Sequence, residues 1–152
     1  MDRKDFSTVT ARLQQALDQT GLSFPASDPH SNVRSVQVQI EAIARGDVEA
    51  VLAEALPDVT LDIFAPPEFP WVRRATGVVE LRRALEQNFG AVDDQQPDIT
   101  NVFAEGNAVV LFGRERGRIR ASGQRYDVEF VEKFTFRDGR LAGIRIIAAH
   151  AA

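Results

Sequence analysis

Glu132 is the residue whose position in this chain most suggests chemistry. The stretch from Gln124 to Ala152 reads as two β-rich runs joined by a turn at Asp138-Gly139. Strand side chains alternate between the two faces of a sheet. The first run therefore puts Glu132 on the same face as five largely apolar side chains: Tyr126, Val128, Phe130, Phe134 and Phe136. A buried carboxylate without a partner is costly, so Glu132 needs either an ion-pair partner or a functional role.

Three arginines are the predicted neighbours of Glu132. If Asp138-Gly139 forms a tight turn, stepping back along both strands places Glu132 opposite Arg145. A turn further upstream brings Arg114 and Arg116 toward the same interior. Guanidinium groups that lie close to a carboxyl group lower its pKa and keep it ionised.

Two interpretations of this cluster remain open. In the functional one it is a polar floor for an anionic or carbonyl-bearing ligand, with Arg114 or Arg145 as electrophile. Glu132 is then a base or the group that orients an arginine. In the structural one, Glu132 and Arg145 form an ion pair that stiffens the sheet. A β-bulge at Phe130-Val131 gives a third outcome, in which Glu132 turns to solvent, because one inserted residue reverses the faces.

Two further side chains could take part in proton transfer. His150 follows the last strand and has an unperturbed pKa near neutrality, so it could act as a base at a pocket mouth or be a solvated bystander. Tyr126 could donate to an oxyanion, or be a core tyrosine with a satisfied hydroxyl. The candidate catalytic residues are therefore Glu132, Arg114, Arg145, His150 and Tyr126.

The segment PPEFPWVRRAT, residues 66–76, combines prolines with Phe69 and Trp71. Aromatic side chains on a stiff loop suit an apolar ligand, because they give contact area at little entropic cost. The alternative is a loop that merely covers the core. The candidate ligand-binding residues are Phe64, Phe69, Trp71, Asn101, Phe112, Arg116 and Phe130.

Helical patterns come first along the chain and strand patterns later. The predicted helices cover residues 3–20, 33–45, 48–56 and 77–89, and a polar segment at 25–32 reads as a linker. The predicted strands cover 59–65, 98–104, 108–120 and the two runs of the closing stretch. This order predicts an α+β fold with helices on one face of an antiparallel sheet.

Four landmarks of the chain are Gly46-Asp47, Asn101, residues 123–127 (GQRYD) and residues 137–141 (RDGRL). With them the chain resembles, over about residues 33–149, the SnoaL-like branch of the nuclear-transport-factor-two-like superfamily. The resemblance implies a cone in which a strongly curved, mainly antiparallel sheet wraps around helices and leaves a pocket. We therefore expect an extra N-terminal helix and linker at 1–31 and a cone domain at 32–152.

The catalytic sets of the family's enzymes do not carry over intact. Limonene-epoxide-hydrolase relatives use an Asp-Arg-Asp arrangement, and here Arg114 matches the arginine while Arg116 and Ala149 stand at the aspartates. Ketosteroid-isomerase relatives keep a general-base aspartate where this chain has Ile63, with Asp62 one position away. The aspartate of the SnoaL-type cyclases has no counterpart.

The composition narrows the function classes. The 152 residues contain no cysteine and carry a net charge of −4, which excludes thiolate chemistry and argues against nucleic-acid or anionic-membrane surfaces. The two histidines are far apart in sequence, so we expect no metal and no cofactor. The N-terminus lacks the apolar core of a signal peptide, and no run has transmembrane length, so we expect a cytoplasmic protein.

The last strand is apolar on both faces, which indicates that both are covered. Helices can cover only one, so we expect a homodimer through the outer face, helped by Val109 and Leu111. Family resemblance implies the same. The main hypothesis is a small-molecule-binding protein for a mostly apolar ligand with a polar or anionic group, acting, if an enzyme, as a cofactor-free isomerase, cyclase or hydrolase. The alternative is a non-catalytic interaction module with a filled pocket.

Overall fold

A six-stranded sheet and a layer of helices build the fold. The computed structural model describes residues 5–20 and 29–152. Its helices are α1 (Ser7–Thr20), α2 (Pro29–Arg45), α3 (Val48–Ala53) and α4 (Val78–Ala91). Its strands are β1 (Ala55–Phe64), β2 (Arg74–Thr76), β3 (Val92–Glu105), β4 (Ala108–Ile119), β5 (Arg125–Arg137) and β6 (Arg140–His150). The predicted α+β class is confirmed.

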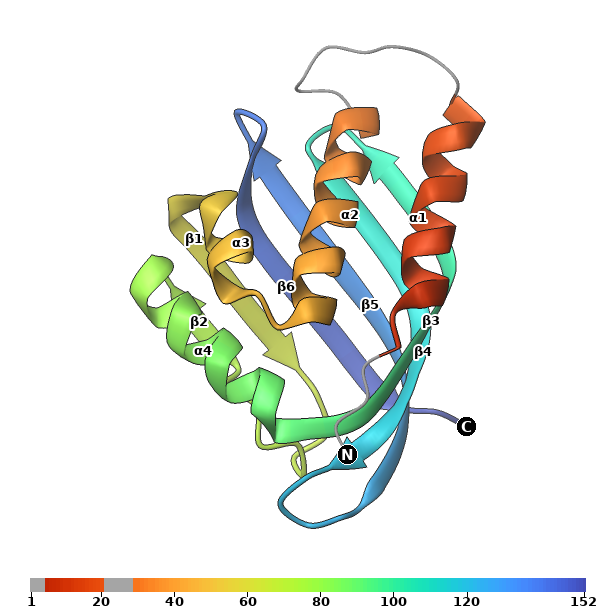
Figure 1. Cartoon of the computed structure of the whole chain (residues 1–152), viewed down its shortest axis with the longest axis vertical. Helices are drawn as coiled ribbons and strands as arrows, with labels where there is room; N and C mark the ends of the chain where they lie inside the picture. Colours follow the sequence, from red (N-terminus) through yellow and green to blue (C-terminus); the bar gives the residue numbers. More distant parts are fainter. Residues whose placement is uncertain (1–4, 21–28) are drawn as a thin grey trace.

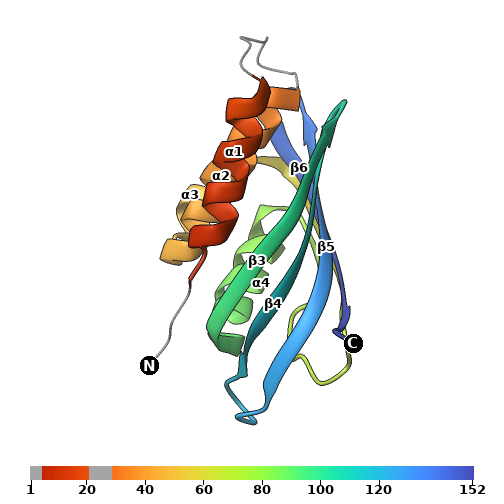
Figure 2. The same cartoon turned by 90° about the vertical axis from the view of Figure 1, so that its right-hand side faces the viewer.

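The described helices all lie on one face of the sheet, called the inner face below (Figure 1; Figure 2 shows the two layers edge-on). The strand order is β2-β1-β6-β5-β4-β3, and every neighbouring pair is antiparallel except β1 with β6. The long strands twist along their length, as the right-handed twist of strands requires. The core lies between the inner face and the helices, around fully buried side chains such as Phe134 and Leu141.

Helix α1 belongs to this core. Its apolar stripe, Val9, Leu13 and Leu17, is buried, as is Phe6 just ahead of the helix. The segment is also held to β3: the Asp5 amide donates to the carbonyl of Gln95 and the Thr8 hydroxyl to that of Pro97. The division into 1–31 and 32–152 stays a prediction, but α1 packs in the same core as the rest of the chain.

Some element ends differ from the prediction. Helix α2 begins at Pro29, so Asn32 is helical and donates to the Gly106 carbonyl instead of belonging to a linker. Gly77 is the N-cap of α4, and the last three residues of the proline-rich segment 66–76 form strand β2. Asp47 is the N-cap of α3, and its carboxylate accepts from the Ala50 amide at 3.0 Å.

A β-bulge at Ala142 decides which side chains of β6 face inward. Phe136 pairs with Leu141 as the turn predicts, but Thr135 pairs with Gly143, so Ala142 is one extra residue. The insertion shifts the register, and Glu132 lies opposite Ile146 rather than Arg145. The predicted pairing of Glu132 with Arg145 is therefore wrong, for the reason that a one-residue shift exchanges the faces of the strand.

The inner face of β4 also differs from the prediction. Val109 and Leu111 were expected on the outer face, but both are buried. Leu111 lies directly opposite Glu132, so the odd-numbered residues of β4 point inward with it. The even-numbered residues, including Arg114 and Arg116, consequently face outward.

Candidate functional site

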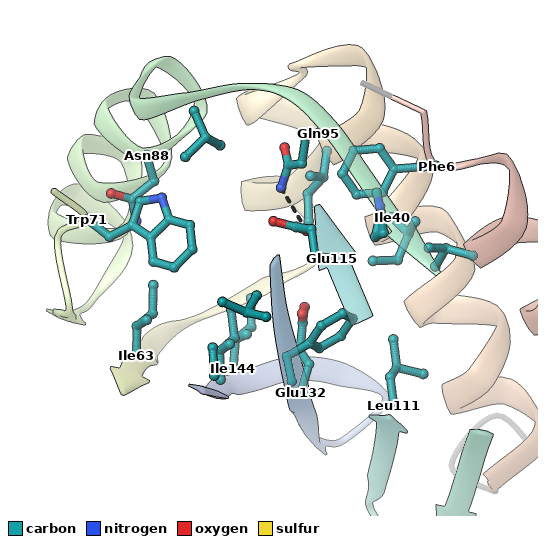
Figure 3. A pocket seen from close by; sticks show the side chains of 18 of the residues that line it. Phe6, Ile40, Ile63, Trp71, Asn88, Gln95, Leu111, Glu115, Glu132 and Ile144 are labelled. Atoms are coloured by element: carbon teal, nitrogen blue, oxygen red, sulfur yellow. Dashed lines mark hydrogen bonds between the residues drawn. The ribbon is translucent and has the colours of Figure 1, made fainter. Parts of the chain in front are cut away.

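An internal cavity of about 160 Å³ lies between the helices and the inner face of the sheet. Figure 3 shows most of the side chains that surround it. Helices and loop contribute Phe6, Val9, Ile40, Ile43, Trp71, Leu85, Asn88 and Phe89. The strands contribute Leu61, Ile63, Val92, Gln95, Pro97, Ile99, Leu111, Glu115, Val128, Phe130, Glu132, Ile144, Ile146 and Ala148. The wall is thus largely apolar, with two carboxyl groups and two amides.

Glu132 points into this cavity, as the alternation along β5 predicts (Figure 3). Within the described part of the chain its carboxyl group has no ion-pair or hydrogen-bond partner. Burial raises the pKa of Glu132 to about 8, and the negative charge of Glu115 adds to the rise. The expected lowering of this pKa by arginines is therefore wrong, and Glu132 is a neutral acid at neutral pH.

Glu115 is the second carboxyl group of the cavity, and it was not among the predicted site residues. Its carboxylate accepts from the Tyr126 hydroxyl at 2.7 Å and from the Gln95 side-chain amide at 3.1 Å. Tyr126 is buried, and burial together with the neighbouring Glu115 raises its pKa, so it remains a donor. Gly117, directly across from Tyr126, leaves room for the ring, since a Cβ there would lie 2.5 Å from the hydroxyl. Glu115 is thus a carboxylate fixed by two donors.

The sequence does contain a signal for Glu115. Along β4 it lies midway in an alternating series of apolar residues and glycines, Leu111, Gly113, Gly117 and Ile119, that marks the inner face. Arg114 and Arg116, on both sides of Glu115, belong to the outer face of the same strand. Gly113 has a matching role to Gly117, because a Cβ there would lie 2.9 Å from the ring of Phe130, which lines the cavity.

The predicted catalytic arginines lie outside the cavity. Arg114 makes a bidentate ion pair with Asp127 on the outer face, and Arg116 approaches the same carboxylate at 3.5 Å. Hydrogen bonding by Arg114 lowers the pKa of Asp127. Arg145 is exposed, with its guanidinium carbon 5.0 Å from the centre of the Phe64 ring. These side chains form surface contacts, and the structure does not bring them to Glu132.

The aromatic loop after β1 closes one side of the cavity. Trp71 lines the cavity, and Phe69 is buried behind it in a stacked pair with ring centres 4.4 Å apart. Arg73 donates to the backbone carbonyls of Ala65, Pro66 and Phe69. The loop is thus internally bonded, which fixes the indole at the cavity wall.

The other predicted residues divide between the cavity and the surface. Phe130 lines the cavity. Phe64 and Phe112 are exposed on the outer face, and Asn101 is exposed on β3. His150 is half-exposed at the end of β6, where its Nε2 lies 2.7 Å from Glu68 of the loop.

Two negative findings concern only the described residues. None of their His, Asp and Glu side chains form a group of three or more that could hold a metal ion. None of their helices is long and apolar enough to cross a membrane.

The family model of the SnoaL-like domain matches residues 36–144, which is more than two thirds of the chain. The chain belongs to this family. The match begins inside α2, so α1 lies outside it, although Phe6 and Val9 contribute to the cavity wall. Family and cavity together indicate a domain of the small-molecule-binding type.

Similar solved structures agree with this fold. An NTF2-like protein from Burkholderia xenovorans LB400 is 22% identical with a TM-score of 0.68, over 81% of this chain and 92% of that one. A candidate SnoaL-like polyketide cyclase from Jannaschia sp. CCS1 is 20% identical with a TM-score of 0.66, over 84% and 91%. An epoxide hydrolase from M. tuberculosis, described as LEH-like, is 21% identical with a TM-score of 0.59, over 78% and 82%. A comparison with curated proteins gave no match.

Proposed function

We propose that the chain binds a compact, mostly apolar molecule with one polar group in the internal cavity. The observation that carries this proposal is Glu132, a carboxyl group that faces an apolar cavity and has no partner among the described residues. Proteins seldom bury such a group unsatisfied, because each buried polar group left unpaired costs about 1–3 kcal/mol. A ligand that hydrogen-bonds to Glu132 removes this cost.

The size and charge of the cavity restrict the ligand. An apolar cavity of roughly 150 Å³ holds a benzene-sized molecule, so a volume of about 160 Å³ suits a small ring or a branched aliphatic group. No Lys, Arg or His is among the described residues that line it. The anionic ligand that the sequence allowed therefore has no counter-charge here, and we propose a ligand that carries no negative charge.

If the protein is an enzyme, its two cavity carboxyl groups are the candidate acid and base, in place of the predicted arrangement of a Glu132 base with arginine electrophiles. Glu132 holds a proton at neutral pH and can donate it, while Glu115 is kept in place by Tyr126 and Gln95 and can accept one. Such a pair suits a cofactor-free isomerisation, cyclisation or hydration. Arg114, Arg145 and His150 have no role in this proposal.

A ligand screen tests the proposal. Neutral, cationic and anionic fragments of up to about ten heavy atoms are screened by ligand-observed NMR and by thermal shift, with wild type, Glu132→Gln and Glu129→Gln. Glu129 is the matched control, because it is an exposed glutamate on the outer face of the same strand. We expect the screen to find fragments that bind wild type and Glu129→Gln equally well. Their affinity for Glu132→Gln should be at least tenfold lower. If no fragment binds in the cavity of wild type, the proposal is wrong.

A second candidate function is self-association through the outer face of the sheet. An apolar row crosses four neighbouring strands there, from Phe64 on β1 through Ile147 on β6 and Val131 on β5 to Phe112 on β4. Phe64, Phe112 and Ile147 are 40–49% exposed. An apolar patch that the described elements leave open is typical of an interaction surface.

The charges beside this row favour a second copy of the chain as the partner. On β5, Lys133 lies on one side of Val131 and Glu129 on the other, and all three side chains share the outer face. Two copies stacked with their strands reversed place Lys133 of each against Glu129 of the other. Sedimentation equilibrium of wild type and of Ile147→Lys tests this: we expect a dimer and a monomer, respectively. A monomeric wild type at tens of micromolar protein would rule the interface out.

A further inference from the structure

The cavity combines two carboxyl groups with four aromatic side chains, and this combination restricts the ligand further. Phe6, Trp71, Phe89 and Phe130 come from different parts of the chain and all line the cavity. Aromatic faces and carboxylates both attract organic cations, and such sites recognise ammonium groups. Building on the proposed function, we propose that the ligand is a compact organic ammonium ion, held between these rings and paired with Glu132.

The polar groups of the wall leave Glu132 as the group that meets the ligand. The Asn88 side chain accepts from the Val72 amide at 2.8 Å and donates to the Val72 carbonyl at 3.2 Å. The Gln95 amide donates to Glu115, and the Tyr126 hydroxyl does the same from behind the wall. Both side-chain amides of the wall are thus bonded to protein groups, whereas Glu132 has no such partner in the described chain.

The charge balance inside the cavity favours a cation over a neutral ligand. Of the elements around Glu132, β4 alone contributes another titratable side chain to the wall, which is Glu115. The residues of α1, α2, α4, β1, β3 and β6 in the wall are apolar or amides. Among the described residues of the wall, a cation therefore meets two carboxyl groups and no positive charge. The cation stabilises the ionised form of Glu132, which burial and the charge of Glu115 disfavour.

Binding has a proton balance that can be measured. The carboxyl group of Glu132 loses its proton to solvent, and the resulting carboxylate forms an ion pair with the ammonium ion. One proton is thus released for each cation bound, as long as the pH lies below the range in which free Glu132 ionises. Linkage then makes the affinity rise about tenfold for each unit of pH below the range in which free Glu132 ionises. Above that range the affinity no longer changes with pH.

Three small probes of similar shape separate the possible charges. They are tetramethylammonium, neutral tert-butanol and anionic pivalate, each titrated into the full chain by isothermal calorimetry at pH 6, 7, 8 and 9. Tetramethylammonium has no proton of its own, so a pH dependence reports on the protein. At pH 8 we expect tetramethylammonium to bind at least tenfold more tightly than tert-butanol. Its affinity should fall about tenfold for each unit of pH below 7.5. Titrations in buffers of different ionisation enthalpy should show that protons are released on binding. Pivalate should not bind.

Two variants connect the effect to Glu132. Glu132→Gln should lose both the preference for the cation and its pH dependence, while Glu129→Gln should keep both. If tert-butanol binds wild type as tightly as tetramethylammonium at pH 8, or if cation binding does not change with pH, the inference about charge is wrong and the proposed small-molecule site survives. If none of the probes and no fragment of the wider screen binds in the cavity, the proposed function itself is wrong.

Discussion

The two faces of strands β4 and β5 differ in whether their charged side chains have ion-pair partners. On the outer face, Arg114 and Arg116 meet Asp127 in solvent, so each charge has a partner. On the inner face the same strands carry Glu115 and Glu132 with no basic side chain among the described residues of the cavity wall. Ion pairs at a surface contribute little to stability, whereas a buried carboxyl group such as Glu132, which has no partner among the described residues, is costly. The charges of this outer-face cluster thus pair with each other, whereas on the inner face the described residues supply no partner for Glu132.

The largest expected difference between the faces is the pH dependence of stability that Glu132 causes. The pKa of Glu132 is about 8 in the folded protein against an ordinary value of 4.5, so between these values the folded state keeps a proton that the unfolded state has lost. Stability therefore falls as the pH rises, by about 1.4 kcal/mol per unit and by about 4 kcal/mol from pH 5 to pH 8. Urea unfolding at each pH measures it. Glu132→Gln should remove this slope and Glu129→Gln should not; equal slopes in wild type and Glu132→Gln would contradict the burial of the group.

The next largest effect is expected where the inner face is packed against backbone. A Cβ at Gly113 would lie 2.4 Å from the Asp98 carbonyl oxygen and 2.9 Å from the Phe130 ring. Gly113→Ala should therefore destabilise the protein by about 3 kcal/mol, since overpacking moves both. Gly90→Ala is the matched control, because a Cβ added at this position in α4 would have nothing within 4 Å. It should raise the free energy of unfolding by up to about 1 kcal/mol. Equal effects of the two variants would show that β4 can move away from Asp98 and Phe130 at little cost.

A smaller effect is expected from the support of Glu115. Tyr126→Phe removes the 2.7 Å hydrogen bond to its carboxylate and should lower the free energy of unfolding at pH 7 by about 2 kcal/mol. The variant should also shift the pH at which Glu132 titrates, followed by NMR of its side-chain carboxyl carbon, because the charge of Glu115 contributes to that titration. A loss of stability without any shift would mean that the two carboxyl groups are not coupled.

The smallest effect is expected on the outer face. Arg114→Ala removes the bidentate pair with Asp127, but both side chains are more than one third exposed. Solvent and salt screen such a pair, so we expect only a small loss of stability that disappears at 1 M NaCl. Chemical unfolding at low and high salt measures it. A large loss that persists at high salt would mean that the outer face is covered by a partner.

Much of the fold could be predicted from the sequence because local signals agree with it. The stripe of α1 repeats every three or four residues, Asp47 is a capping residue ahead of an apolar run, and Asp138-Gly139 is a turn that sets Phe136 opposite Leu141. The inward position of Glu132 follows from the same alternation. These features depend on neighbours in the sequence, and such neighbours are visible without a structure.

The composition of the site could not be predicted in the same way. A bulge has no strong sequence signature; the hint here is Gly143, where a Cβ would lie 2.9 Å from the Thr60 hydroxyl oxygen of the neighbouring strand. Without the bulge, the register of β6 places Arg145 beside Glu132, which is what we expected. The cavity wall also depends on α1 and α4, which pack against it from distant parts of the sequence.

The extra residue at Ala142 has a consequence for how such a site can change. Substitutions on β6 alter one side chain at a time, and a deletion of Ala142 would keep Gly143 opposite Thr135 and Ile146 opposite Glu132. If Ala142 instead joined a regular ladder, the rest of β6 would slip by one residue, its two faces would be exchanged and Arg145 would lie opposite Glu132. The same sequence thus has two registers one residue apart, and they differ in whether the cavity carries its own counter-ion for Glu132.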